Sequence, residues 1–226
     1  MGEVFALSKR RIKFAKLGLS KFISHLDLQR TFARAVMRSG LPVKYSNGFN
    51  PHQIMTFSLP LAVGVTSESE YVDIDFDESA SNEEVEEKLK KALPPDIKLI
   101  KVSMPQVSAN DICAAEYILK FCDICFEKEK LESFFEEKEL PVIKKSKKGD
   151  KEVNLKDYII DCEILELNKN SAKLKAVLSA GGSKNIKPSL LAEKLLSYMG
   201  EDLETIVYIH RTEIFYDNGK EMKTFC

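Results

Sequence analysis

The sequence predicts an α+β protein made of two ferredoxin-like (βαββαβ) domains in tandem, with mostly antiparallel sheets and helices on one face. Two observations lead to this prediction. Strand-like alternation and helix-like periodicity follow one another in the order β-α-β-β-α-β over residues 1–105, which is the ferredoxin-like order. A looser version of that order returns over residues 112–226, after the short link PQVSAND. We therefore expect two domains with these boundaries.

The first domain begins with RRIKFAK, which alternates basic and apolar side chains as a half-buried strand does. The helix SHLDLQRTFARAVMRSG follows, with Ser24 as its cap, Asp27 three residues later, and Gly40 as its stop. The remaining elements are strands at HQIMTFS, EYVDIDF and DIKLIKVSM and an acid-rich helix at SNEEVEEKLKKAL.

The second domain repeats this order with an extra hairpin. Its expected strands are AEYILKFCDICF, YIIDCEILELN, SAKLKAVLSA and TIVYIHRTEIFY, and its expected helices are KEKLESFFEEKEL and PSLLAEKLLSYMG. The basic segment PVIKKSKKGDKEVNL predicts the hairpin, which should turn near Gly149 and Asp150. This insertion makes the match to the ferredoxin-like order weaker here than in the first domain.

The net charge of −1 conceals a strong segregation of charge along the chain. Residues 9–60 hold ten lysines and arginines and one acid, Asp27, whereas residues 68–87 hold ten acids and no base. Such asymmetry predicts an anionic partner for the first segment, internal pairing between the two segments, or both.

Part of this segregation has an internal explanation. In a ferredoxin-like sheet the first and third strands are neighbours, so Arg11 and Lys13 should face Asp73 and Asp75. Each opposite-charge pair across two strands contributes about 0.2–1 kcal/mol. The arginines of the first helix are left without an explanation of this kind.

Those arginines, Arg30, Arg34 and Arg38, recur every four residues and therefore share one helix face, opposite Phe32 and Val36. Three cations in a row repel one another unless an anion or acids lie over them. Two interpretations stay open: a solvated helix face, and a stripe that follows phosphates, which the planar arginine fork fits well.

The segment YSNGFNPHQ after this helix combines a turn signal at Asn47-Gly48 with a proline that would interrupt a plain hairpin. Side chains that hydrogen-bond and one aromatic ring crowd into it: Lys44, Tyr45, Ser46, Asn47, Phe49, Asn50 and His52. Single-stranded RNA recognition uses this mixture of stacking, amide readout and cations. A catalytic loop with His25 and His52 as general acid or base, and a rigid loop whose asparagines bond their own backbone, are the alternatives.

A second candidate is GGSKNIKPSLL in the second domain. Its glycines free the backbone, its lysines add positive charge, and Pro188 suits the first turn of a helix. A basic loop that runs into a helix N-terminus predicts an anion site, although an ordinary strand–helix connection has the same features. The anion-site residues would be Gly181, Gly182, Lys184, Asn185 and Lys187. The Walker spacing of nucleotide hydrolases is missing.

The sequence predicts neither a metal nor a cofactor. Cys122 and Cys125 form one CxxC in a strand-like run without a second pair, so we interpret them as structural. Asp73 and Asp75 share a strand face but lack further ligands for a metal. No apolar run approaches the roughly 20 residues that span a bilayer, and no signal peptide is evident, so we expect no membrane partner and a cytoplasmic location.

Three motifs carry a family resemblance: FISHLDLQR at Phe22–Arg30, YSNGFNPH at Tyr45–His52, and LPLAVGVTSESEYVD at Leu59–Asp73. Their order and spacing closely resemble those of the bacterial radical-SAM-linked protein family, a domain of unknown function. The likeness is specific over about the first 105 residues and looser afterwards, where Gly181–Pro188 is similar to a further motif of the family. Gln53-Ile54 depart from the proline and basic residue that the family usually has there.

The resemblance implies a partner, because members of that family are fused to, or encoded beside, radical SAM proteins with a cobalamin-type domain, often near genes for ribosomal proteins and ribonucleases. This chain lacks the CxxxCxxC that would hold the radical SAM cluster. Together with the basic segment, the resemblance predicts an RNA-binding accessory protein that works with a radical SAM partner on ribosomal RNA, tRNA or nascent ribosomes.

Two other function classes remain open. One is a metal-independent endoribonuclease that uses His25 or His52, because CRISPR repeat-processing endoribonucleases are also tandem ferredoxin-like proteins; this is an architectural analogy only. The other is a protein-interaction adaptor that docks the radical SAM enzyme through the acidic segment and binds no RNA.

Overall fold

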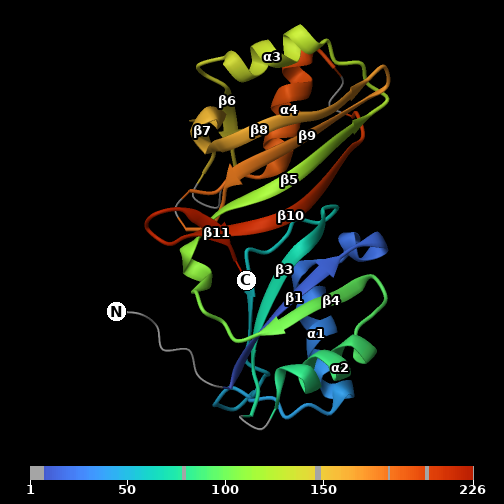
Figure 1. Ribbon diagram of the computed structural model, residues 1–226, viewed down its shortest axis with the longest axis vertical. Helices are drawn as coiled ribbons and strands as arrows, with labels where there is room; N and C mark the ends of the chain where they lie inside the picture. Colours follow the sequence, from blue (N-terminus) through green and yellow to red (C-terminus); the bar gives the residue numbers. More distant parts are fainter. Residues whose placement is uncertain (1–7, 78–79, 146–148, 183, 202–203, 226) are drawn as a thin grey trace. The chain divides into compact units, whose positions relative to one another are not determined.

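The computed structural model describes residues 8–77, 80–145, 149–182, 184–201 and 204–225. Within these ranges the chain is an α+β protein with four α-helices, and the strand pairings inside each part are antiparallel, so the expected fold class is confirmed at this level (Figure 1). The chain divides into two compact units: unit 1 extends to Asp111 and includes Thr224 and Phe225, and unit 2 runs from Ile112 to Lys223.

Unit 1 contains, in chain order, β1 (Lys9–Lys16), α1 (His25–Ser39), β2 (Met55–Ser58), β3 (Thr66–Asp75), α2 (Asn82–Ala92) and β4 (Ile97–Ser103). In its sheet β1 lies between β4 and β3, and β2 pairs with the other side of β3. The two helices begin and end where the sequence predicts. Ser24 and Ser81 accept hydrogen bonds from the backbone N–H groups of Asp27 and Glu84, and Gly40 ends α1 in the left-handed conformation with φ 65°.

The core of unit 1 forms because alternate side chains of its strands face the helices. Ile12 and Phe14 of β1 and Val72 of β3 are fully buried together with apolar residues of α1 and α2. The ring of Phe14 lies 4.6 Å from that of Phe32 on α1, centroid to centroid. Both helices therefore cover the same face of the sheet (Figure 1).

The opposite face of this sheet is polar and carries the predicted ion pair. The β1–β3 register sets Arg11 against Asp73, and two hydrogen bonds of 2.8 Å join the guanidinium Nε and Nη2 to the two carboxylate oxygens. This confirms the predicted pairing of the two strands. Lys13 lies opposite Tyr71 rather than Asp75, with its ammonium 5.5 Å from the ring centroid, so that part of the prediction was wrong. The strands pair in a register that places Asp75 opposite Lys9.

Unit 2 contains β5 (Ile112–Cys122), α3 (Lys128–Glu136), β6 (Pro141–Lys144), β7 (Lys151–Asn154), β8 (Ile159–Asn168), β9 (Ser171–Ser179), α4 (Pro188–Met199) and β10 (Val207–Asp217). The short β11 (Met222–Thr224) begins in unit 2, and its last residue belongs to unit 1. The main sheet of unit 2 has the order β10-β5-β9-β8. β6 and β7 form the predicted extra antiparallel pair, and part of the expected turn between them lies outside the described residues. Leu191 and Leu195 bury one face of α4, and Phe134 of α3 packs edge-on against Tyr198 of α4 at 5.2 Å.

Candidate nucleic-acid interface

The segment between α1 and β2 is a short hairpin-like loop with a closed stem. Tyr45 and Gln53 form an antiparallel bridge, and the backbone N–H of Ser46 donates to the carbonyl of His52 at 2.8 Å. The side chain of Ser46 closes the stem further, because its Oγ accepts from the His52 backbone N–H at 3.1 Å and lies 2.9 Å from His52 Nδ1. The predicted turn is thus present, and its stem holds the tip, residues 47–51, in place.

The tip is exposed. Asn47, Gly48, Asn50 and Pro51 are exposed, and the ring of Phe49 is fully accessible to solvent. Burying an aromatic side chain is ordinarily favourable by about 1.5–3 kcal/mol, so a fully exposed one beside two amide side chains is available for stacking. Of the loop residues predicted to bind RNA, the tip presents three side chains that could touch bases.

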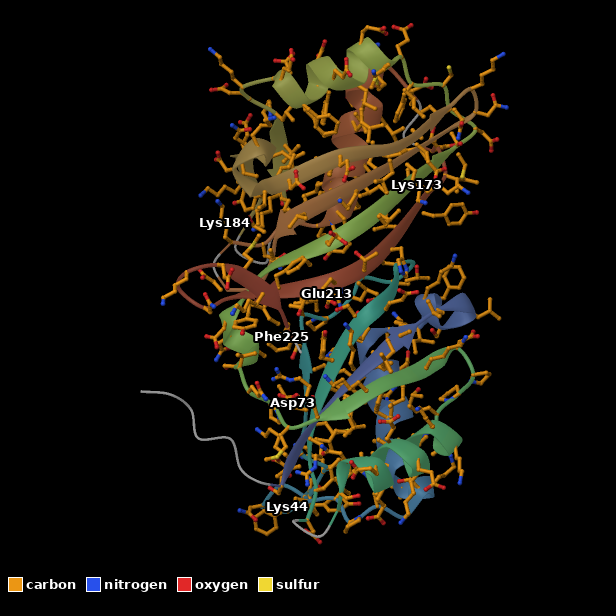
Figure 2. All side chains as sticks on the ribbon, in the orientation of Figure 1. Lys44, Asp73, Lys173, Lys184, Glu213 and Phe225 are labelled. Atoms are coloured by element: carbon orange, nitrogen blue, oxygen red, sulfur yellow. The ribbon has the colours of Figure 1, made fainter. Side chains whose placement is uncertain are left out.

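The stem is anchored both to the sheet and to α1. The Lys44 N–H donates to the carbonyl of Asp75 at the end of β3 at 2.8 Å, and the Asp75 N–H donates to the carbonyl of Ile54 at 3.2 Å. On the other side, Gln53 Nε2 donates to the carbonyl of Ala33 in the middle of α1 at 3.2 Å. Backbone contacts therefore hold Lys44, labelled in Figure 2, at the base of the loop.

Gln53 anchors the loop, a role that the sequence motifs did not reveal. Its side chain is only 7% exposed, and its Oε1 has no hydrogen-bond partner among the described residues. The signal in the sequence was its place in HQIMTFS, two residues before the inward-facing Met55.

The three arginines of α1 differ in their surroundings. Arg30 Nη1 lies 3.1 Å from Asp27 Oδ1. The hydrogen bond with the Ser24 side chain, and to a smaller extent that with Arg30, lowers the pKa of Asp27. Arg38 Nη2 donates to the carbonyl of Ala92, the last residue of α2, at 2.6 Å. Arg34 is exposed and has no hydrogen bond or ion pair within the part of the chain that the structure describes. Arg34 directly follows Ala33, whose carbonyl accepts the hydrogen bond from Gln53 of the loop stem. The guanidinium of Arg34 therefore belongs to the turn of α1 that contacts the stem.

The two histidines do not come together. His25 is half-buried in the first turn of α1, where Phe57 packs edge-on against its ring at 5.5 Å and its Nε2 lies 3.2 Å from Gln29 Nε2. His52 is exposed in the loop stem. The neighbouring Gln53 contacts Ala33, which is about 12 Å along the helix axis from His25. His25 and His52 are therefore too far apart to act together as a general acid and a general base.

In unit 2 the predicted anion-site residues divide into two kinds. Gly181 has φ +78°, and a Cβ there would meet the backbone oxygen of Ile112, so this glycine is required by packing. Gly182, φ +40°, has open space around it. Lys184, Asn185 and Lys187 are exposed, while residue 183 lies outside the described residues. Lys187 is the N-cap of α4 without a side-chain cap, and Pro188 is in the first turn as expected.

The described residues contain no cluster of three or more histidine, cysteine or acidic side chains that could hold a metal ion. Asp73 is engaged by Arg11. Burial raises the pKa of the Cys162 thiol to about 12, which suppresses the thiolate that reactive or metal-binding cysteines need. Cys122 is half-buried and Cys125 exposed. Within the part of the chain described by the structure, no helix has the length and apolar character needed to cross a membrane.

The solved structures that are similar to this chain in fold include two complexes. A chain in a "Cbf5-Nop10-Gar1 Complex" superposes with a TM-score of 0.55 at 12% identity over 92% of this chain and 49% of that chain. A chain in an "H/ACA RNP bound to a substrate RNA containing 2'-deoxyuridine" gives 0.51 at 10% identity, over 91% and 47%. This chain spans about half the length of those it matches. At these identities the likeness shows the fold alone.

Comparison by sequence gives two results. No curated protein matches the chain. A family model described as "Uncharacterized protein conserved in bacteria (DUF2344)" matches residues 9–188, which include the loop, α1 and most of unit 2.

Proposed function

Since the chain belongs to the bacterial DUF2344 family over a region that reaches into both units, we propose that the two units serve one function, the binding of single-stranded RNA. One observation carries this proposal: the exposed ring of Phe49, flanked by Asn47 and Asn50, at the tip of a loop whose stem is closed and anchored. Aromatic stacking and amide contacts to base edges are how proteins bind unpaired bases.

Cations at the base of the loop supply the second part of such a site. Arg34 is exposed and unpaired among the described residues, and Lys44 begins the stem. Phosphate contacts from arginine and lysine provide affinity and position the strand, whereas base contacts provide preference among sequences. Arg30 and Arg38, which already have internal partners, would contribute less.

The folds of the two solved complexes support this proposal at the level of architecture. One of those complexes is an RNP bound to a substrate RNA, and we infer that the corresponding fold in this chain serves RNA as well. We also propose that both units are ferredoxin-like. The orders β4-β1-β3-β2 and β10-β5-β9-β8, each antiparallel and each built from βαββαβ apart from the β6–β7 insertion, support that assignment.

The RNA class and the protein partner are proposed from the family resemblance of the N-terminal motifs. On that basis the chain is an accessory protein that presents ribosomal RNA, tRNA or a nascent ribosome to a radical SAM partner. The adaptor alternative, which needs a free acidic face, has less support. Glu84, Glu86 and Glu87 of α2 pair with lysines four residues later on the same helix, which offsets their charge.

A second function is favoured by one contact. Ser46 Oγ lies 2.9 Å from Nδ1 of the exposed His52, and this contact orients the imidazole ring. The other ring nitrogen, Nε2, is not used in that contact and can exchange a proton with a bound RNA, as a general acid or base must. The chain would then be a metal-independent endoribonuclease. His52→Ala should in that case abolish cleavage of bound RNA in the presence of a chelator and leave binding intact.

The test of RNA binding is a titration of labelled single-stranded RNAs of different sequence with Phe49→Ala. Losing one stacked base costs about 1–3 kcal/mol, so we expect a loss of roughly 5- to 150-fold in affinity and reduced preference among sequences. Phe22→Ala is the matched control, because Phe22 is an exposed aromatic residue of unit 1 outside the loop. If the unsubstituted protein binds no RNA at low salt, the proposal is wrong.

A further inference from the structure

A groove of about 830 Å³ lies on unit 2 between β6 and α4. Lys144 and Lys145 line it from the β6 side, Lys187 lines it at the start of α4, and Lys194 lines it two turns further along the helix. These four lysines come from segments about 40 residues apart in the chain. Their proximity is therefore a product of the fold of unit 2.

The residues that line the groove carry a net positive charge. Among its lining residues Glu193 is the one carboxylate, and the first turn of α4 has no acidic residue. None of the four lysines makes an ion pair within the described part of the chain. By contrast, Lys173 and Lys175 on the sheet of the same unit pair with Glu166 and Glu163. Clustered like charges repel one another, so an anion in the groove would relieve this repulsion.

The neutral polar groups of the groove suit the same kind of ligand. Asn185, Ser189 and Ser197 lie among its lining residues, and amide and hydroxyl side chains share with lysine the contacts that proteins make to phosphate oxygens and sugars. The ring of Tyr158, which lines a separate cavity of unit 2, lies beside Lys144 of the groove. The ammonium of Lys144 is 5.3 Å, and that of Lys184 5.8 Å, from the centroid of this ring. Basic grooves with adjacent aromatic rings are typical of single-strand binding.

We propose that this lysine groove binds the phosphate backbone of single-stranded RNA, as a contact on unit 2 that is separate from the loop of unit 1. The inference rests on the proposed function and extends it, because it assigns to unit 2 a further, sequence-independent contribution to the affinity. An acidic peptide is the other ligand that such charges could attract, and binding to polyglutamate distinguishes it.

The test uses the full chain with Lys145, Lys187 and Lys194 replaced together by glutamine. Lys144 is retained because of its contact with Tyr158. The matched control replaces Lys120, Lys169 and Lys220, which are exposed lysines of unit 2 outside the groove, so that both variants lose the same charge. Affinity for a homopolymeric single-stranded RNA is measured as a function of salt. Each lost phosphate contact reduces the slope of log K against log salt by roughly 0.7, so the groove variant should lose about 2.

The outcomes separate the two proposals. A groove variant that loses affinity and slope beyond the control supports the inference. If the groove variant equals the control while Phe49→Ala still weakens RNA binding, the groove inference is wrong and RNA binding by unit 1 stands. If the groove variant retains RNA binding but loses binding to polyglutamate, the groove serves an acidic protein and the inference is also overturned. An unsubstituted chain that binds no RNA ends both proposals.

Discussion

Ser46 and His52 fasten the two sides of the loop to each other: Ser46 Oγ lies 2.9 Å from His52 Nδ1 and accepts from the His52 backbone N–H at 3.1 Å. One hydroxyl thus organises both the backbone and the imidazole ring. The stem that these contacts close carries Phe49, Asn47 and Asn50 at its tip. We therefore expect the Ser46 side chain to order the loop before a ligand binds.

Replacing Ser46 by alanine should therefore loosen the loop without unfolding unit 1. The His52 N–H loses its acceptor and should exchange faster with deuterium, and RNA affinity should fall by several-fold because ordering the loop becomes part of binding. Hydrogen exchange followed residue by residue measures the first effect. Ser46→Thr keeps the hydroxyl and serves as control. Unchanged exchange at His52 in the alanine variant would mean that the Oγ contact does not hold the loop.

Arg34 and Arg38 share a helix face but should respond differently to substitution by glutamine. Arg34→Gln removes an exposed cation without an internal partner among the described residues and should reduce the salt slope of RNA binding by roughly 0.7 with little change in stability. Arg38→Gln removes the contact with the Ala92 carbonyl at the C-terminal end of α2 and should cost about 0.3–1 kcal/mol of unfolding free energy. Urea denaturation and salt titration of both variants check this. Equal behaviour in the two assays would show that α1 presents a uniform stripe.

Removing one partner of the Arg11–Asp73 pair should lower the free energy of unfolding much more than replacing both partners by apolar residues. Both side chains are buried, and Arg11 also donates to the Val107 carbonyl at 2.9 Å and stacks on Phe225 at 4.1 Å; Figure 2 labels Asp73 and Phe225. Asp73→Ala leaves a buried guanidinium without its carboxylate and should cost about 3–5 kcal/mol. The double replacement Arg11→Met with Asp73→Leu should recover most of that loss. Chemical denaturation measures both, and a double variant as unstable as the single one would contradict this account.

Alanine substitutions at Gly181 and Gly182 separate the effect of close packing from that of backbone strain on stability. Both have positive φ, which costs a residue with a side chain roughly 1–2 kcal/mol. A Cβ at Gly181 would in addition overlap the Ile112 backbone oxygen, whereas Gly182 has open space. We therefore expect Gly181→Ala to destabilise the protein clearly more than Gly182→Ala in thermal unfolding. Equal losses would mean that Gly181 is not closely packed against β5.

The raised pKa of the Cys162 thiol predicts that the free energy of unfolding falls at alkaline pH. Burial, with a smaller contribution from Asp161, raises the pKa of this thiol from 9.0 to about 12. Because the native state holds this proton more tightly, the resulting stabilisation is complete below about pH 9 and is lost as the pH rises toward 12. Cys162→Ala should show a shallower decline over this range. Thiol labelling near neutral pH should modify the exposed Cys125 faster than Cys162.

Much of unit 1 could be predicted because its elements depend on short-range patterns. The cap at Ser24, the stop at Gly40 and the alternation in β1 and β3 are local features, and the alternation also places Arg11 on the polar face. The register placed Lys13 opposite Tyr71 and not opposite Asp75, because a strand pattern specifies which face a side chain occupies but not its partner across the sheet.

The sequence by itself determined the α+β class, the order of the elements and the exposed polar loop, because these follow from periodicity, capping and turn residues close together in the chain. Only the tertiary structure decided which partners individual side chains contact. It brought Gln53 to Ala33 and Arg38 to the end of α2, and it assembled the lysine groove from β6 and α4. Such contacts join segments distant in sequence, and they arise from packing and register that no local pattern encodes.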